Sequence, residues 1–152
     1  MGRLVLVAVA LAFALSLVGC GTNGGASCPK SGILVSGGGT TRATAYRAAL
    51  YTSYEAANST SPVYFSFETT TAGNYTGCVG TTATTDMAFD LWDLTSATRV
   101  LTCNDYTADN PDERCSTAAS RYPLAGSATY YVQVYDHGPD YGGTFALTVT
   151  KD

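Results

Sequence analysis

Short stretches in which apolar and polar side chains alternate recur along this chain, and each predicts a β-strand with one buried face. In residues 63–68, for example, Val63, Phe65 and Phe67 alternate with Tyr64, Ser66 and Glu68. The same pattern predicts further strands at 74–79, 87–94, 99–103, 130–135 and 144–150. Turn-forming residues separate them, and residues 136–143 predict a hairpin loop. Seven or eight short antiparallel strands predict an all-β fold, an antiparallel β-sandwich of the jelly-roll kind.

Residues 41–58 do not follow this pattern clearly. The alanines of the segment favour a helical turn, whereas its tyrosines fit a strand equally well. The segment therefore stays ambiguous between the two.

The first twenty residues predict an exported, lipid-anchored protein. A cationic start is followed by an apolar run at 4–18 that is short for a membrane span, and then by Leu17-Val18-Gly19-Cys20. These residues are typical of a bacterial lipoprotein signal peptide, residues 1–19, cut before a lipidated Cys20. An ordinary secretory peptide cut near Gly19 is the alternative. We expect residues 20–31 to be a flexible tether and 32–152 to be one domain on the bacterial cell envelope, at the outer membrane or cell surface.

The net charge of the chain limits the classes of partner that it can bind. The formal net charge is −4 at pH 7 and only 13% of the residues are charged. This balance disfavours a nucleic-acid partner, and without a basic cluster the membrane attachment falls to acyl chains on Cys20.

Four cysteines remain after Cys20, and in an exported protein they predict two disulfides, for which three connectivities exist. The short spacing of Cys103 and Cys115 favours a local bridge around a polar loop, which leaves Cys28 to pair with Cys78. A zinc site is disfavoured, since there is no CxxC pair and only one histidine.

Three segments resemble the bacterial pre-peptidase C-terminal domain. They are VYFSF at 63–67 with AGNY at 72–75, TDMAFDLW at 85–92, and LAG at 124–126 followed by YYVQV at 130–134 and GTFALTV at 143–149. The resemblance implies a small β-sandwich of the kind appended to secreted peptidases, which in some relatives holds fibrous protein or polysaccharide, sometimes with calcium. Some relatives also carry a cysteine pair spaced like Cys103 and Cys115. No peptidase domain accompanies the module in this sequence, so protease activity is not carried over.

Acidic residues in the loop between Cys103 and Cys115 make a structural calcium ion the one cofactor candidate, because hard cations need clustered oxygen ligands. Two aspartates of a neighbouring strand are added by the resemblance. The candidate ligands are Asp86, Asp90, Asp105, Asp109, Asp112 and Glu113. The alternative is a solvated acidic loop, and the spacing is not that of an EF-hand.

Four aromatic residues fall on the outward phase of their strands and are the candidate ligand-binding residues: Tyr64, Trp92, Tyr131 and Tyr135. Such rings give a large contact area at little entropy cost. Alternatively, a loop or residues 41–58 cover them.

Catalysis is not expected. The only histidine, His137, lies in a predicted loop without a nucleophile motif. We therefore predict a non-catalytic, lipid-anchored module that holds an extracellular protein or polysaccharide. The alternative is a structural or accessory lipoprotein that assists a secreted enzyme or an envelope complex.

Overall fold

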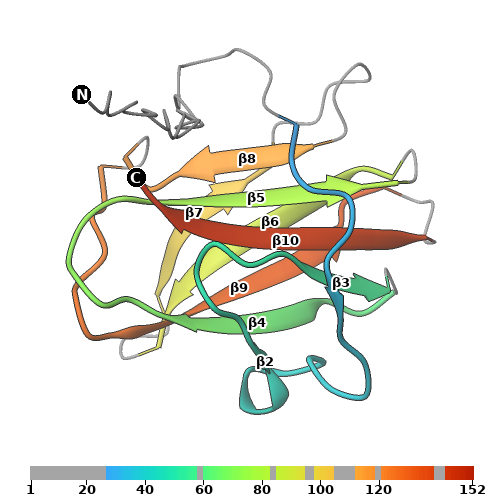
Figure 1. Cartoon of the computed structure of the whole chain (residues 1–152), viewed down its shortest axis with the longest axis horizontal. Coiled ribbons are helices and arrows are strands. Elements are labelled where there is room, and N and C mark those ends of the chain that lie inside the picture. Colours follow the sequence, from blue (N-terminus) through green and yellow to red (C-terminus); the bar gives the residue numbers. More distant parts are fainter. Residues whose placement is uncertain are drawn as a thin grey trace, which may run out of the picture.

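Alternating apolar side chains give two β-sheets one buried face each, and the sheets pack with these faces together (Figure 1). The computed structural model describes residues 27–57, 60–82, 85–94, 98–104, 112–118, 121–138 and 143–152. Sheet A has the order β1-β3-β10-β5-β8, and sheet B has the order β2-β4-β9-β6-β7. The strands of sheet A are β1 (Ile33–Leu34), β3 (Tyr54–Ala57), β10 (Thr144–Lys151), β5 (Tyr75–Thr81) and β8 (Glu113–Ser116). The strands of sheet B are β2 (Tyr46–Arg47), β4 (Val63–Glu68), β9 (Thr129–Asp136), β6 (Met87–Asp93) and β7 (Arg99–Cys103).

The predicted all-β sandwich is confirmed, with corrections at the sheet edges. Strands β4 and β7 have the predicted bounds, and β5, β6, β9 and β10 differ from them by one or two residues at their ends. The expectation of antiparallel strands alone was wrong, because β1 pairs with β3 and β2 with β4 in parallel. Both sheets are therefore mixed, and each parallel strand is only two residues long.

The ambiguous segment 41–58 contains a turn as well as strands. Residues Arg42–Thr44 form a 3₁₀ helix (η1), and β2 and β3 follow. Thr41 caps η1, since its hydroxyl accepts from the Thr44 amide and the Thr44 hydroxyl accepts from the Thr41 amide. Of the alanines only Ala43 lies in the helical turn, whereas Tyr46 and Tyr54 lie in strands and Tyr51 is exposed between them.

The core lies between the two sheets and is rich in aromatic rings. Phe65 of β4 is fully buried, and its ring lies 6.2 Å from that of Phe145 in the opposite sheet. On the other side Phe67 stacks on Tyr130 at 5.9 Å and approaches Tyr75 at 6.1 Å. These contacts join strands β4, β9, β5 and β10 across the sandwich.

Residues 27–32 form a strap that crosses the outer face of sheet A (Figure 1). A disulfide joins Cys28 to Cys78 of β5, with 5.4 Å between the Cα atoms. The strap passes so close to Gly80 that a Cβ atom there would lie 2.4 Å from the Pro29 carbonyl oxygen. Ala146, opposite Gly80 in β10, is fully buried although it points away from the core. Residues 28–31, which the sequence predicts to be part of the flexible tether, are thus packed on sheet A and bound to it by a disulfide.

The close approach at Gly80 makes a stability prediction. We expect Gly80→Ala to destabilise the domain by about 1–3 kcal/mol, since the new Cβ must push the strap off sheet A. The control is Gly138→Ala, where the new Cβ has no neighbour nearer than 3.4 Å. Urea unfolding of both variants measures the difference, and equal midpoints would contradict the strap packing.

Within these described ranges no helix has the length and apolar character needed to cross a bilayer. The predicted signal peptide and Cys20 lie outside the described residues.

Candidate functional site

The outer face of sheet B is the candidate site, because it carries all four aromatic residues that the sequence singles out. Trp92 of β6 lies directly opposite Tyr131 of β9, and Tyr64 of β4 lies opposite Gln133. Tyr135 lies opposite Ala88. Directly opposed residues share a face of the sheet, and these four rings are half-buried. The structure therefore brings the four rings together, while their binding role stays a prediction.

Trp92 has an additional neighbour that sequence reasoning did not find. The guanidinium carbon of Arg42 lies 4.4 Å from the centroid of the Trp92 ring, a cation–π contact. Arg42 comes from η1, fifty residues earlier, so no local pattern could indicate the contact. One face of the Trp92 ring is therefore covered by the Arg42 guanidinium.

A hollow of about 250 Å³ lies on the same face. It is lined by Thr60, Ser61 and Pro62 from the chain before β4, and by Asp90, Gln133, Tyr135 and Asp136 from β6 and β9. Of these residues, the sequence pattern pointed to Tyr135 and Asp90 only, because the others line the hollow through their position in the folded sheet. The hollow makes this face more than a flat aromatic surface.

Asp90 is a structural member of this hollow. It is 5% exposed, accepts a hydrogen bond from the Thr102 hydroxyl at 2.7 Å and lies 3.6 Å from Arg99 Nη1. A buried carboxylate needs such partners to offset its lost hydration. Asp90 thereby joins β6 to β7, a role that its prediction as a calcium ligand did not include.

Two polar groups in the hollow have no hydrogen-bond partner in the described part of the chain. Among the described residues, neither the Gln133 amide nor the Tyr135 hydroxyl makes a hydrogen bond, whereas Asp136 accepts one from the Gly138 amide at 2.8 Å. Burial raises the pKa of Tyr135, and the nearby Asp90 and Glu113 carboxylates raise it further against the opposing effect of Arg99. The Tyr135 hydroxyl therefore keeps its proton at neutral pH and is a donor as well as an acceptor.

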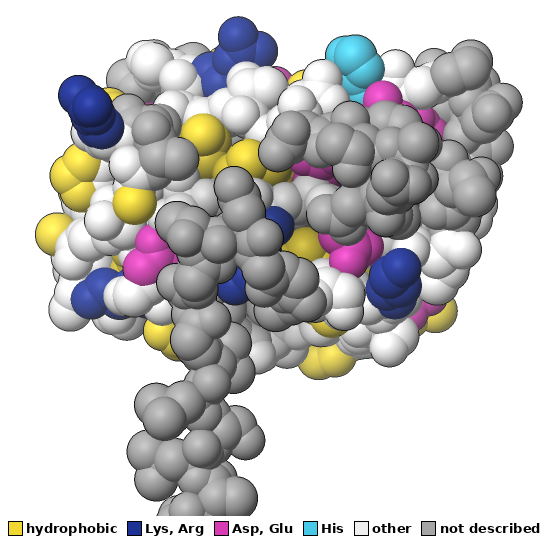
Figure 2. Space-filling view, turned by 90° about the horizontal axis from the view of Figure 1, so that it is seen from above, with side chains coloured by type: hydrophobic (Ala, Val, Ile, Leu, Met, Phe, Trp, Pro, Cys, Tyr) yellow, Lys and Arg dark blue, Asp and Glu magenta, His cyan; other side chains and the backbone are white. Residues whose placement is uncertain are grey.

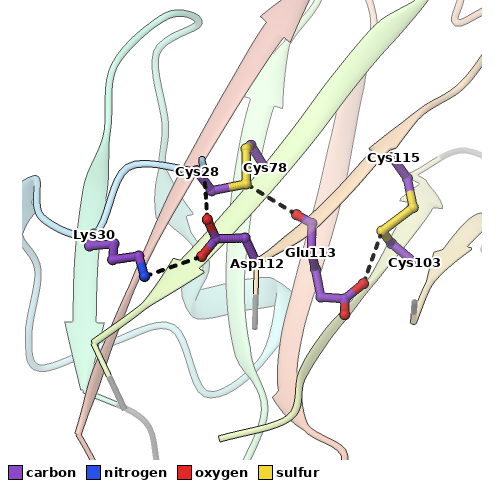
Figure 3. Close-up of a disulfide and its surroundings, with 7 residues drawn as sticks. All are labelled: Cys28, Lys30, Cys78, Cys103, Asp112, Glu113 and Cys115. Atoms are coloured by element: carbon purple, nitrogen blue, oxygen red, sulfur yellow. Dashed lines mark hydrogen bonds and ion pairs between the residues drawn. A yellow bond between two sulfur atoms is a disulfide. The ribbon is translucent and has the colours of Figure 1, made fainter. Parts of the chain in front are cut away.

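Asp112 and Glu113, two predicted calcium ligands, lie at the strap (Figure 3). Asp112 accepts a hydrogen bond from the Cys28 amide at 2.9 Å and lies 3.8 Å from Lys30 Nζ. Glu113 is fully buried between the two disulfides, 3.5 Å from a sulfur of each. Oxidised cysteines carry no proton, so these sulfur contacts are van der Waals contacts. Both acids thus support the strap and the disulfides.

Of the remaining predicted calcium ligands, those that the structure describes do not form a cluster with these. Asp86 Oδ2 lies 3.6 Å from His137 Nδ1, at the start of β6, while Asp105 and Asp109 lie outside the described residues. Within the described part of the chain, no three acidic, histidine or cysteine side chains form a group that could hold a metal ion. Figure 2 agrees, since acidic side chains (magenta) lie at several separate places among its coloured residues. Calcium binding therefore stays a prediction.

Both predicted disulfides are present. Cys28 pairs with Cys78, and Cys103 at the end of β7 pairs with Cys115 of β8, with 5.8 Å between the latter Cα atoms. The second disulfide joins sheet B to sheet A. Disulfides are typical of proteins outside the cytosol, so the pair indicates an exported domain.

No protein-family model matches this chain, and no curated protein matches it. Among solved structures, it is similar to the pre-peptidase C-terminal domain of collagenase from Bacillus anthracis, with a TM-score of 0.55 and 17% sequence identity. The match covers 70% of this chain and 94% of that domain. It shows a fold like that of the domain that the sequence resembles.

Proposed function

We propose that this protein is a non-catalytic binding module, anchored to the bacterial cell envelope by lipid on Cys20, that holds an extracellular protein or polysaccharide. The observation that carries the proposal is the outer face of sheet B. This face combines Tyr64 and Tyr131, the Arg42–Trp92 pair and the polar hollow.

Rigidity supports this choice of face. The four rings belong to three hydrogen-bonded strands whose inner side chains are locked in the core, so little conformational entropy is lost when a ligand binds. Aromatic rings and an arginine on such a surface are the side chains that dominate binding energies in protein interfaces. An extended polymer is the ligand that fits this face best, because the candidate contact residues are spread along three neighbouring strands.

The anchor complements this face. The strap fixes the start of the domain to sheet A through Cys28, whereas the candidate site lies on sheet B. A lipid chain on Cys20 would therefore reach the domain from the layer opposite to the binding face, which leaves that face open to a ligand.

A pull-down tests the proposal. We expect the soluble domain, residues 27–152, to be retained on at least one of insoluble collagen, cellulose, chitin and peptidoglycan. Tyr131→Ala with Trp92→Ala should reduce that retention at least about tenfold, since two contact rings are lost. The matched control is Tyr122→Ala, which removes an exposed tyrosine outside the strands of sheet B.

Retention on none of the four polymers would contradict the proposal. So would retention that the double variant and Tyr122→Ala reduce equally. Circular dichroism of each variant confirms that the β-sandwich is intact before retention is compared.

A further inference from the structure

We propose that the hollow on sheet B binds a single neutral sugar residue, so that the polymer on this face is a polysaccharide. The inference rests on the proposed function and names its ligand class. It is carried by the size of the hollow, by two polar groups that make no hydrogen bond among the described residues, and by the pairing of Asp90 with Arg99.

The size of the hollow favours one ring. Its volume of about 250 Å³ lies below the roughly 300–1,000 Å³ of sites for drug-sized ligands. Loop residues 60–62 form one wall, and residues of β6 and β9 form the rest. A hexose ring fits such a space, while a stretch of polypeptide with its side chains needs a longer groove.

The polar groups in the hollow match hydroxyl groups. The Gln133 amide offers donors and an acceptor, and the Tyr135 hydroxyl offers one of each. A sugar hydroxyl also donates and accepts, so it can satisfy both residues at once. An ammonium group can only donate hydrogen bonds, so it would leave the donors of Gln133 and Tyr135 unpaired. A carboxylate can only accept them, so it would leave the acceptors of these two residues unpaired.

The charge of Asp90, the more deeply buried carboxylate of the hollow, is already balanced, which favours a neutral ligand over a cationic one at that carboxylate. Asp90 is already paired with Arg99 and with the Thr102 hydroxyl, and Asp136 accepts from the Gly138 amide. The raised pKa of Tyr135 keeps its hydroxyl neutral. A cationic ligand would have to compete with Arg99 for Asp90, whereas a sugar can add hydrogen bonds to the arrangement that exists.

The neighbouring rings continue the site along the strands. Tyr64 lies opposite Gln133, and Tyr131 lies two residues before Gln133 on the same face, a step of roughly 6.5–7 Å. A sugar bound in the hollow would therefore have adjoining units over Tyr64 and Tyr131, where the apolar side of a ring can pack on an aromatic face.

The test is a titration of the ¹⁵N-labelled soluble domain, residues 27–152, followed by NMR. The ligands are glucose, galactose, mannose, xylose and N-acetylglucosamine, with methylammonium and acetate as charged probes. We expect saturable shifts of the Gln133 side-chain amide and of the backbone amides at 133–136 with at least one sugar. Affinity on the order of millimolar is expected for a ligand of this size.

Gln133→Leu keeps a side chain of similar bulk and removes the amide, and it should weaken sugar binding about tenfold or more. Tyr135→Phe removes only a hydroxyl and should weaken binding severalfold. The control is Thr129→Val, on the same strand and the same face but opposite Glu68 and away from the hollow. It should leave the affinity unchanged.

The inference is overturned if none of the sugars shifts these signals, if Gln133→Leu binds as well as the unmodified domain, or if methylammonium or acetate alone shifts them. The polymer pull-down separates this failure from failure of the proposed function. Polymer retention without sugar binding in the hollow contradicts only the inference, and sugar binding without retention on any polymer contradicts only the proposed function.

Discussion

Replacing Cys28 and Cys78 together with serine is expected to lower the free energy of unfolding by about 4 kcal/mol. The disulfide joins residues 50 positions apart. Closing a loop of that length lowers the conformational entropy of the unfolded chain, which stabilises the folded state by about 4 kcal/mol. The native strap keeps its other contacts in the variant, because Asp112 still accepts from the amide at position 28 and lies near Lys30. The loss should therefore come chiefly from the unfolded state, and the β-sandwich should stay folded.

The matched control is the double serine variant at Cys103 and Cys115. That bridge spans only 12 residues, so its removal should cost about 3 kcal/mol, less than the first. Urea unfolding of residues 27–152, which lack Cys20 and so leave no free thiol, measures both losses. A smaller loss for the Cys28–Cys78 variant than for the control would contradict the account.

The same variant gives a second readout of the strap. Lys30 is the one basic residue of the strap, and its ion pair with Asp112 restrains it in the native state. Without the disulfide, opening of the strap exposes the bond after Lys30, and trypsin should cut there faster than in the unmodified domain. An unchanged cleavage rate would mean that the non-covalent contacts alone hold the strap on sheet A.

The strands of the core were predictable because their signal is local. In β4, β6, β9 and β10 the alternation of side chains decides both the strand and the face that it buries. The alternation also decides which side chains point into the core. In β9, Val132 and Val134 are buried, and Tyr131 and Tyr135 lie on the other face. This is why the four candidate rings could be assigned to the outward phase of their strands before the strands were placed in a sheet.

Strands β1, β2 and β8 at the sheet edges could not be predicted, because they depend on contacts between residues far apart in the sequence. Strands β1 and β2 have two residues each and exist only because β3 and β4 offer backbone groups to pair with. Strand β8 begins inside what the sequence indicated as a polar loop, and its pairing with β5 is set by contacts distant in the chain. The Arg42–Trp92 contact and the hollow share this origin, since each joins segments whose separation along the chain hides their proximity.

Acidic residues that are close together in the sequence do not necessarily form a metal site in the fold. Asp112 and Glu113 stand together in the sequence with other acids, which favoured a cation site. In the fold their partners are remote, since Asp112 meets Cys28 and Lys30, and Asp90 meets Arg99 and Thr102. A carboxylate near a strand end can thus serve the packing of another segment, and only the tertiary structure shows which segment that is.

Phe65→Ala is expected to destabilise the domain by about 3–5 kcal/mol, the range for removing a large aromatic side chain from a packed core. Phe65 is fully buried, and its ring lies 5.6 Å from Tyr46, 6.5 Å from Tyr54 and 6.2 Å from Phe145. Alanine leaves a cavity that these three rings, fixed on different strands, can fill only in part. Phe65→Leu keeps most of the volume and should cost less, about 1–2 kcal/mol.

The neighbouring residue supplies the control. Tyr64 points to the outer face of sheet B, so Tyr64→Ala should change stability by about 1 kcal/mol or less. It should instead reduce polymer retention, because it removes a ring beside the hollow. Urea unfolding and the pull-down together therefore separate the two faces of β4, one holding the sandwich together and the other meeting the ligand. The reverse result, with Tyr64→Ala the more destabilising change, would mean that β4 is shifted by one residue, and it would move every proposed contact residue on that strand into the core.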